Sequence, residues 1–469
     1  MTEVRERREE LVQRVPRLQV AFAVAMAAIC SCYWFVQVVR GDYYRELADN
    51  NRTRSLTVRS PRGLITDRHG LLLAENAPSY ELTFDATRSA GAERALAFAA
   101  QVLGRPLAEL RAAAIPDPDD PPFQPVLLTA DLTLAQVSRF AATALEYPEF
   151  EIAAGHRRLY RHGAQTAHVL GYVGEVSREE IETTAGRLRP GAQIGKRGVE
   201  RAFDERLRGQ DGHRVLVVDS QGRTRAEQRR EPAVPGENLR LTLDLELQQE
   251  AARFFADRKG AAVALDPRDG TVRVMFSAPS YDPNLFSRRL DRSQWQALLE
   301  VPGDPLQNRT IQNAYAPGSV FKIVMAVAGL SEGAVAPGDS VFCAGAKTFY
   351  GRSTRCWKAG GHGWVDLYAA IQHSCDVYFY TLGQQLGVER IAEYARRFGL
   401  GEVTGFDIPG ERSGLVPDEA WSLASRRTPW YPGETISLAI GQGPLLVTPL
   451  QVAQLMAVVA NDGSRVTPR

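Results

Sequence analysis

The amino-acid sequence predicts an α+β protein that consists of one N-terminal transmembrane helix and two larger parts outside the membrane. An uncharged apolar run near the N-terminus is long enough to cross a bilayer once. The region that follows mixes short strand and helix patterns, and the remainder combines a strand pair with long apolar helices. A chain of 469 residues can form two or three domains with real cores.

The composition is that of a globular protein, with 44% hydrophobic residues and a formal net charge of +1. It therefore indicates neither disorder nor nucleic-acid binding. Only five of the 56 basic residues are lysine. Arginine supplies positive charge elsewhere, so a retained lysine draws attention to chemistry that arginine cannot perform, above all the loss of a proton.

The membrane prediction rests on residues 18–39, LQVAFAVAMAAICSCYWFVQVV, which contain no charged side chain. Five arginines precede the run, so residues 1–17 are expected to stay in the cytoplasm and the rest of the chain to lie outside. A cleaved signal peptide is one alternative, but the run is long for one and no A-x-A-like site follows it. The other alternative is a buried helix, which Tyr33 and Trp34 near the far end disfavour.

The two outer parts meet near REPAVPGENLRLTLD, a segment with proline and glycine followed by an alternating strand pattern. We predict one domain over 40–235 and a second over 236–469. Three stretches of the first domain, at 59–74, 156–174 and 195–212, indicate by themselves only a turn-rich, arginine-rich surface.

The second predicted domain begins with a helix and a hairpin. The helix is DLELQQEAARFFAD, and the hairpin within 260–284 places two apolar strands around a D-P-x-D-G turn. Helical patterns then dominate as far as Gly463. The pattern predicts a cluster of helices packed on a sheet.

A candidate nucleophile lies in the heptapeptide APGSVFK. Pro317 and Gly318 precede an apolar helix that starts at Ser319, where helix-terminal amides favour developing negative charge. The i, i+3 spacing places Lys322 within reach of the serine hydroxyl. If apolar neighbours desolvate the lysine, its neutral form can accept the serine proton.

A second element, HSCDVYFY, places Ser374 and Asp376 on either side of a cysteine at the start of an aromatic helix. A second hydroxyl near the lysine could relay its proton to a leaving group. An ordinary helix N-cap is the alternative interpretation of Ser374.

Three of the five cysteines lie close together in the sequence with a histidine, at a spacing of C-x12-C-x5-H-x12-C. The four candidate zinc ligands are Cys343, Cys356, His362 and Cys375. Such a set suffices for a closed tetrahedral zinc site. The alternatives are a Cys343–Cys356 disulfide and unpaired thiols, and His373 is a possible substitute ligand. Cys30 and Cys32 lie in the membrane run and need no special role.

The order Ser-x-x-Lys and, about 50 residues later, Ser-x-Asp resembles the pattern of the penicillin-binding and serine β-lactamase superfamily. The chain from its anchor to Gly463 resembles the class B penicillin-binding proteins, most of all the elongation-specific penicillin-binding protein 2 branch. The stretches that carry the resemblance are PRGLITDRHG, APGSVFK, SCDVYFY, ERSGLVPDEAW, PWYPGETISLAIGQG and TPLQVAQLMAVVANDG. Asp376, where most relatives have asparagine, also fits this branch.

The resemblance implies an elongated, non-catalytic α/β pedestal over 40–235 and a transpeptidase domain over 236–469. It implies that Ser319 is the acylated nucleophile, Lys322 the base and Ser374 the proton relay, with Asp376 shaping the substrate site. No cofactor is implied for the chemistry. Some relatives have metal ligands at positions equivalent to the cysteine and histidine set, including the middle residue of Ser-x-Asp, which favours structural zinc.

The function that the resemblance implies is that of a membrane-anchored peptidoglycan D,D-transpeptidase. Such an enzyme cross-links stem peptides ending in D-Ala-D-Ala during cell-wall elongation and binds β-lactams covalently. It implies the bacterial cytoplasmic membrane as the location, with most of the chain in the periplasm or extracytoplasmic space. The implied partners are a RodA-type glycan polymerase and other elongation proteins.

The third motif of the superfamily, K-T-G, is absent from the sequence. Lys347 and Thr348 are followed by Phe349 and lie between the first two motifs, which is the wrong order. We therefore expect a C-terminally truncated chain whose transpeptidase domain is incomplete and which need not be active alone.

Two other functions remain open at this point. A carboxypeptidase or β-lactamase of the same superfamily would hydrolyse its acyl-enzyme, although the long non-catalytic region disfavours it. A non-enzyme would act as an acyl-binding sensor or as a scaffold that activates a glycan polymerase. Cross-linked products would distinguish the transpeptidase from both.

Overall fold

The fold is described from a computed structural model of the chain. The described residues are 2–44, 53–88, 91–115, 125–129, 132–183, 192–218, 224–287 and 292–469. Their packing forms two compact units, Met1–Ser60 with Gln210–Val234 and Pro61–Gly209 with Pro235–Arg469. The second unit holds most of the predicted pedestal and the predicted transpeptidase domain, so the boundary between those two domains stays a prediction.

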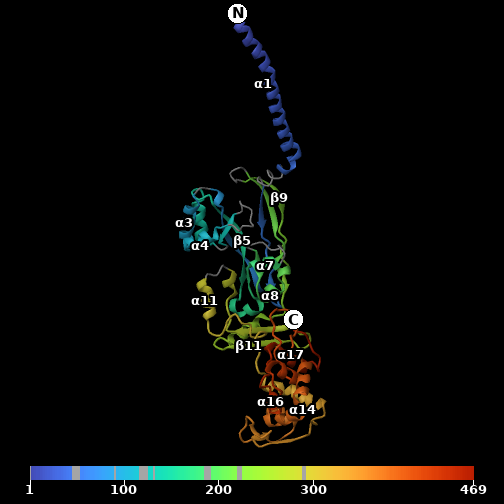
Figure 1. Ribbon diagram of the computed structural model, residues 1–469. Helices are drawn as coiled ribbons and strands as arrows, with labels where there is room; N and C mark the ends of the chain where they lie inside the picture. The colour runs from blue at the N-terminus through green and yellow to red at the C-terminus, as the bar shows by residue number, and fades with distance from the viewer. Residues whose placement is uncertain are drawn as a thin grey trace. The chain divides into compact units, whose positions relative to one another are not determined.

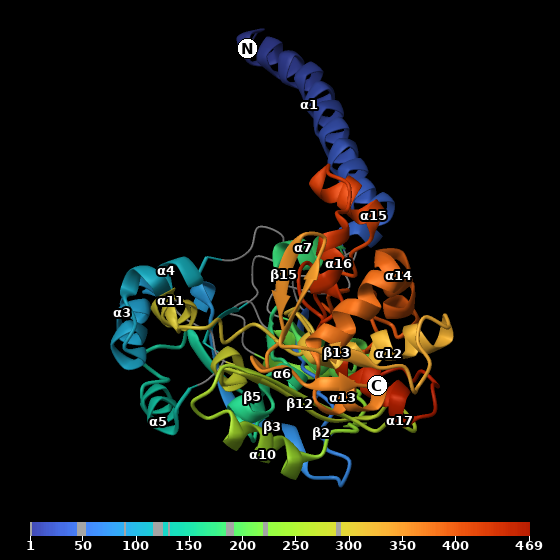
Figure 2. The same ribbon diagram turned by 90° about the horizontal axis from the view of Figure 1, so that it is seen from below.

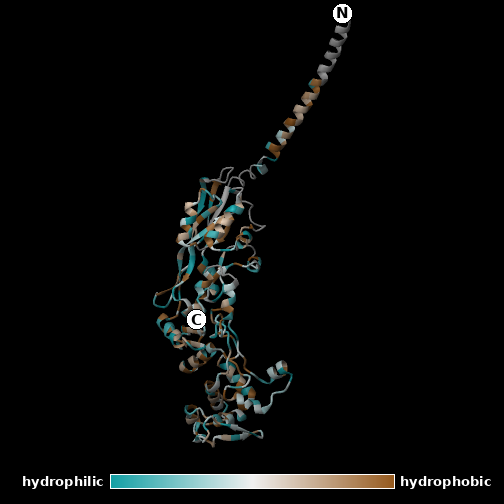
Figure 3. Cartoon of the chain, turned by 90° about the vertical axis from the view of Figure 1, so that its left-hand side faces the viewer, coloured by the Kyte–Doolittle hydropathy of each residue, from teal (hydrophilic) through white to brown (hydrophobic). Residues whose placement is uncertain are grey.

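The first unit begins with a long helix. Helix α1 (Thr2–Trp34) continues into a π-helical turn, η1 (Phe35–Val39). Within it, Leu18–Val39 has a mean hydropathy of 1.9 and no buried residue, and apolar residues predominate along it in Figure 3. At about 1.5 Å per residue, this stretch matches the roughly 30 Å core of a bilayer. The predicted membrane span therefore coincides with a helix of suitable length and composition.

The same unit contains a small antiparallel sheet in the order β1-β8-β9. Its strands are β1 (Thr53–Val58), β8 (Gly212–Val218) and β9 (Thr224–Glu231). The central strand thus comes from a segment far along the chain from the first, and most of the predicted pedestal lies between them in sequence.

The second unit contains the main pedestal sheet, in the order β10-β2-β3-β4 with β5 also paired to β3. Its strands are β2 (Ile65–Thr66), β3 (Leu72–Phe84), β4 (Val126–Thr129), β5 (Phe150–Tyr160) and β10 (Leu239–Arg240). Strands β3 and β5 pair antiparallel over their length, from Ala74 opposite Tyr160 to Phe84 opposite Phe150. The strand predicted after the domain joint is only the two residues of β10, parallel to β2.

Short helices complete this region, and three of them enclose an apolar core with the end of β3. These three are α3 (Ala92–Leu103), α4 (Leu107–Ala113) and α5 (Leu134–Ala142), coloured blue to teal in Figure 1. The others are η2 (Ala86–Arg88), η3 (Gly163–Gln165), α6 (Ala167–Leu170), α7 (Arg178–Thr183), α8 (Gly198–Ala202) and α9 (Asp204–Arg208), with strands β6 (Val173–Glu175) and β7 (Gln193–Gly195).

The three arginine-rich stretches do not simply form surface, so that prediction is wrong at their central residues. Arg62, Arg158 and Glu200, one from each stretch, meet in a buried ionic cluster. The Glu200 carboxylate is 2.5 Å from Arg62 Nε and 2.7 Å from Arg158 Nε, and its side chain is fully buried. Each charge is paired, which is what allows such groups to leave water.

The next part of the unit begins as predicted. Helix α10 (Leu245–Phe254) is capped by Asp244, whose carboxylate accepts a hydrogen bond from Leu247 N. Strands β11 (Gly260–Leu265) and β12 (Val272–Ala278) form the antiparallel hairpin. Helix α10 packs against β12, and α17 (Pro449–Ala460) packs against β11.

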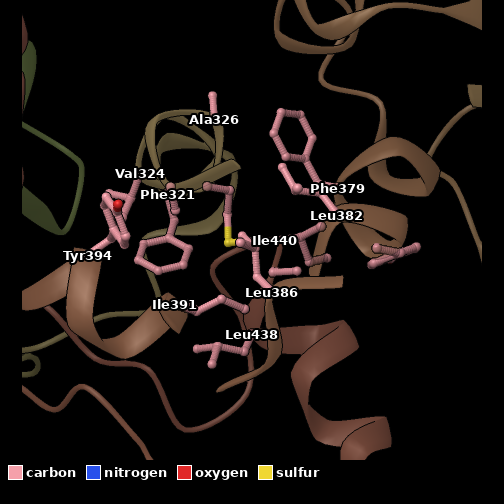
Figure 4. Close-up of a cluster of buried hydrophobic side chains, with 14 of the residues drawn as sticks. Phe321, Val324, Ala326, Phe379, Leu382, Leu386, Ile391, Tyr394, Leu438 and Ile440 are labelled. Carbon is pink, nitrogen blue, oxygen red and sulfur yellow. The ribbon is translucent and has the colours of Figure 1, made fainter. Parts of the chain in front are cut away.

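A helical core lies beyond this hairpin. Helix α12 (Lys322–Ser331), α14 (Asp376–Arg397) and α16 (Pro432–Leu438) pack their apolar faces together. Figure 4 shows side chains of this core directed toward one another, among them Phe321, Val324, Phe379, Leu382, Leu386, Ile391 and Leu438. Gly383 permits the approach of α14 to α16, because a Cβ there would be 2.5 Å from Ala439 Cβ.

The remaining elements of this region are short. They are η4 (Pro283–Ser287), α11 (Arg292–Glu300), η5 (Gly318–Phe321), β13 (Val341–Cys343), β14 (Ala346–Phe349), β15 (Arg352–Arg355), β16 (Gly363–Val365), α13 (Leu367–Gln372), α15 (Glu419–Trp421) and η6 (Ser422–Arg426). Strand β13 pairs with β16, and β14 with β15. Helices α12, α13 and α14 contact one another, as Figure 2 shows, and bring both predicted motifs to one place.

Candidate active site

The candidate nucleophile, Ser319, lies in the 3-10 turn η5, and the α-helix proper begins only at Lys322. The predicted helix start is thus a tight turn followed by α12. Ser319 is exposed, whereas Lys322 is buried with 2% of its surface accessible. An accessible hydroxyl therefore sits one turn from a buried amine.

A second loop supports the turn that carries Ser319. The backbone N–H of Gly318 donates to Gly441 O at 2.9 Å. Both glycines have positive φ, and a Cβ on Gly441 would be 2.2 Å from Gly318 O. Only glycine permits this approach. The sequence analysis used the AIGQG segment only as a family resemblance and did not anticipate this contact.

The two predicted serines and the lysine form a chain of hydrogen bonds. The Ser374 hydroxyl donates to Ser319 Oγ at 2.8 Å, and Lys322 Nζ donates to Ser374 Oγ at 3.0 Å. Among the described side chains, Ser319 and Lys322 share no direct hydrogen bond. The Ser374 hydroxyl therefore connects the candidate nucleophile to the candidate base.

The surroundings of Lys322 are partly as expected. Its amine is buried, and the ring of Phe379 on α14 lies 5.5 Å from Nζ. The amine also forms an ion pair with Asp376 Oδ1 at 2.6 Å, and it donates to Ser374 O at 3.0 Å. The desolvation inferred from the sequence is thus accompanied by a carboxylate partner that the sequence analysis had not assigned.

The helix-cap interpretation of Ser374 is wrong. Cys375 occupies the N-cap position of α14 and makes no side-chain cap, while the Ser374 hydroxyl faces Ser319. Ser374 has a φ of 51°, in the left-handed region that residues other than glycine rarely adopt. A cap would not require this conformation.

Asp376 begins α14 and has two protein partners. Oδ1 pairs with Lys322, and Oδ2 accepts the backbone N–H of Trp357 at 3.0 Å. Its predicted contribution to the substrate site stays a prediction. Trp357 was missed by the sequence analysis, because nothing in its spacing distinguishes it from any residue after Cys356.

The four candidate zinc ligands are brought together. The ligand atoms of Cys343, Cys356, His362 and Cys375 all lie within 4.8 Å of one another. His362 Nδ1 is 3.6 Å from the sulfurs of both Cys343 and Cys356. Tetrahedral zinc with typical Zn–S and Zn–N bonds separates sulfur from nitrogen by about 3.6 Å. The donor types therefore fit one zinc ion, and so do the two sulfur–nitrogen distances of 3.6 Å.

The alternatives for these cysteines can be compared with the same geometry. All five cysteines are free, so the Cys343–Cys356 disulfide is not formed. His373 stacks against His362 with ring centroids 5.9 Å apart and is not a member of the ligand group.

The electrostatics of the group are those of a buried set. Burial raises the pKa of Cys375 to about 12. Burial, together with the nearby Lys358 and His373, lowers the pKa of His362 and favours the neutral imidazole that binds metals. Burial alone would raise the pKa of Cys343, but hydrogen bonds from the backbone of Gly345 and His362 bring that pKa below its ordinary value.

Comparison with known protein families gives two matches that cover most of the chain. The model of the penicillin-binding protein transpeptidase domain matches residues 260–469. The model of the penicillin-binding protein dimerisation domain matches residues 57–241.

The chain is also similar to individual proteins. The peptidoglycan D,D-transpeptidase MrdA of Acinetobacter baumannii is 35% identical over 474 residues, covering 97% of this chain and 69% of the relative. The solved complex of penicillin-binding protein PBP2 with MreC from Helicobacter pylori matches with a TM-score of 0.81 and 28% identity, over 89% of this chain and 78% of the matched one. A solved peptidoglycan synthase complex matches with a TM-score of 0.67 and 32% identity, over 97% of this chain and 81% of the matched chain. The expected C-terminal truncation stays a prediction.

Proposed function

Since the chain belongs to the penicillin-binding protein 2 family of peptidoglycan D,D-transpeptidases, we propose that it cross-links stem peptides through an acyl-enzyme on Ser319 during cell-wall elongation. The observation that carries the assignment of the residues is the hydrogen-bond chain from Ser319 through Ser374 to Lys322. It joins an exposed nucleophile to a buried amine.

The first step is attack of Ser319 Oγ on the carbonyl of the penultimate D-alanine. The hydroxyl proton passes to Ser374 Oγ, whose own proton passes to Lys322 Nζ, along contacts of 2.8 Å and 3.0 Å. We expect the backbone N–H of Ser319, in η5, to donate to the negative charge that develops on the attacked carbonyl.

Lys322 must offer an amine to accept this proton, and Asp376 provides a way. Their nitrogen and oxygen are 2.6 Å apart at a buried position. Transfer of one proton from Lys322 to Asp376 converts the ion pair into a neutral amine and a carboxylic acid. Burial disfavours charged groups, so it disfavours this neutral pair less than it disfavours the two charges. Asp376 would then hold the proton while Lys322 acts as the base.

The acyl-enzyme forms when the C–N bond to the terminal D-alanine breaks and its nitrogen receives a proton through Ser374. An amine of a neighbouring stem peptide then attacks the Ser319 ester. It loses its proton along the same chain in the reverse direction, and the Ser319 hydroxyl is restored.

The test of this function is the fate of the acyl group. Full-length protein, in membranes or detergent, is supplied with glycan strands that carry pentapeptide stems. We expect dimeric cross-linked stems, released D-alanine and complete inhibition by penicillin. Shortened stems without dimers would instead identify a carboxypeptidase, and unchanged stems would identify a sensor or scaffold.

The predicted location and partners extend this proposal. We place residues 1–17 in the cytoplasm and the part of the chain after Val39 outside the membrane, on the basis of the arginines before the helix. The solved PBP2–MreC complex and the solved peptidoglycan synthase complex support the existence of partner proteins. We propose a RodA-type glycan polymerase and other elongation proteins as these partners. Protease added to vesicles of known orientation tests this placement. The protease should cleave the part after Val39 only in vesicles that expose their outer face, and residues 1–17 should stay protected there.

We further propose that the cluster of Cys343, Cys356, His362 and Cys375 holds one structural zinc ion. The support is the donor set and the 3.6 Å spacing between His362 Nδ1 and two sulfurs. A bound zinc ion would have a structural role and would tie the loop over 343–362 to the start of α14 through Cys375. Because Cys375 lies between Ser374 and Asp376, that tie would restrict both side chains of the second motif.

A further inference from the structure

We propose that Trp357 is a positioning residue for acyl transfer, whose indole N–H holds the Ser374 peptide in the conformation that directs its hydroxyl to Ser319. This inference rests on the proposed role of Ser374 as the proton relay. It concerns a residue that the two catalytic motifs do not contain and that donates no proton itself.

Trp357 contacts the second motif at three acceptors. Its indole Nε1 is 3.1 Å from His373 O and 3.1 Å from Ser374 O, and its backbone N–H donates to Asp376 Oδ2 at 3.0 Å. One residue therefore donates to the backbone on both sides of Ser374 and to the carboxylate that pairs with Lys322.

Ser374 needs such support because of its backbone. Its φ of 51° is one that a residue with a Cβ rarely adopts unless the surroundings hold it. Its carbonyl oxygen receives Lys322 Nζ at 3.0 Å and the indole N–H at 3.1 Å. Loss of either donor frees the peptide to turn, which moves the hydroxyl away from its 2.8 Å contact with Ser319 Oγ.

Burial does not explain the tryptophan. Its side chain is 65% exposed, so the ring itself is not held by a core. Trp364, on strand β16, is 72% exposed, and its described ring contact is with Phe342 at 5.4 Å. Two tryptophans of similar exposure thus differ in the polar contacts of the indole, and Trp364 provides a matched control.

The experiment compares Trp357→Phe with Trp364→Phe in full-length protein purified in detergent. Phenylalanine at 357 keeps the backbone N–H and an aromatic ring beside His362, and it removes the indole donor. We expect Trp357→Phe to slow acylation by labelled penicillin about fivefold to tenfold, the range for loss of a hydrogen bond. Trp364→Phe should acylate at the wild-type rate.

Two further readouts separate positioning from a general structural effect. First, the leaving group of a thioester analogue of acyl-D-Ala-D-Ala is a thiolate, which needs no proton, whereas attack on either substrate uses the Ser374 hydroxyl. Trp357→Phe should therefore slow an amide substrate at least as much as the thioester. Secondly, the Trp357→Phe effect should vanish in a Ser374→Ala background, where no hydroxyl remains to be positioned. Zinc content and melting temperature should be unchanged in Trp357→Phe.

The outcomes are distinct. If wild type is not acylated at Ser319, the proposed function fails first. If wild type is acylated and Trp357→Phe reacts at the same rate, the inference about Trp357 is overturned. It is overturned equally if the thioester is slowed more than the amide, or if the loss persists undiminished in the Ser374→Ala background, since either result indicates disturbed structure.

Discussion

Two buried ionic clusters lie in the second unit, and they differ in what their charges touch. In the pedestal cluster, the Glu200 carboxylate pairs with Arg62 and Arg158, and all three side chains are at most 9% exposed. In the active-site cluster, Lys322 pairs with Asp376 and also reaches the hydroxyl chain that ends at exposed Ser319.

A buried ion pair is therefore not by itself a functional site. Arginine stays protonated, so the pedestal cluster can fix geometry but cannot pass a proton. Lysine can pass a proton, and of the two clusters only the one at the active site connects its cation to an exposed hydroxyl. Substitutions in the first cluster should therefore change stability, and those in the second should change the acylation rate.

The largest expected effect is on the acylation rate. Lys322→Arg keeps the positive charge but cannot accept a proton, so the rate of penicillin acylation should fall about a thousandfold, within the range for general-base catalysis. Rapid-quench labelling with fluorescent penicillin measures it. Lys347→Arg is the matched control, because Lys347 donates a hydrogen bond to Thr381 and lies over the ring of Phe349, and arginine can make both contacts. Normal acylation in Lys322→Arg would refute the proton-transfer role.

The next largest effect should appear in the pedestal cluster. Glu200→Gln leaves the buried Arg158 guanidinium without a carboxylate and leaves Arg62 paired with Asp204 alone, so it should lower the free energy of unfolding by about 3 kcal/mol. Chemical denaturation of the full-length protein in detergent measures this. Glu237→Gln removes an exposed partner of Arg206 and should cost less than about 1 kcal/mol. Equal decreases in the free energy of unfolding in the two variants would show that the buried cluster stabilises the protein no more than an exposed ion pair does.

A third prediction concerns pH. Burial lowers the pKa of His168 from 6.5 to about 4, with Arg309 and Arg197 adding to the effect. Between pH 6.5 and 4 the unfolded chain therefore binds a proton at His168 that the folded chain does not bind. The contribution of His168 to the free energy of unfolding is fully present above pH 6.5 and falls as the pH drops toward 4. Between pH 7 and pH 5 the loss should be about 2 kcal/mol.

The measurement is the pH dependence of unfolding in wild type and in His168→Gln, which cannot titrate. The difference in stability loss between the two proteins should equal the histidine contribution, whatever the other groups do. Parallel pH profiles would show that folding does not lower the pKa of His168.

The smallest expected effect tests the zinc proposal. His362→Ala should lower zinc content from one equivalent to near zero and slow acylation about tenfold, the lower end for support of a site through its surrounding contacts. Cys32→Ser, in the membrane helix, is the control and should retain zinc and activity. Full acylation in a zinc-free His362→Ala protein would separate the cluster from the active site.

Much of this site could be predicted from the sequence. The spacings of Ser319, Lys322 and Ser374 and of the cysteine and histidine set are local patterns, and each set is indeed brought together. The arginine-rich stretches were misjudged because their partners lie far apart in the chain, and no local pattern shows that Glu200 will meet Arg62. The contacts of Trp357 and Gly441 were missed for the same reason.

The most direct test of the account is where penicillin attaches. Full-length wild type, Ser319→Ala and Ser374→Ala are treated with penicillin, digested and mapped by mass spectrometry. We expect wild type to carry one penicilloyl adduct, on the peptide that contains Ser319. The adduct should be absent in Ser319→Ala and should form much more slowly in Ser374→Ala. An adduct on Ser374 or on any other residue, or one that persists in Ser319→Ala, would contradict it.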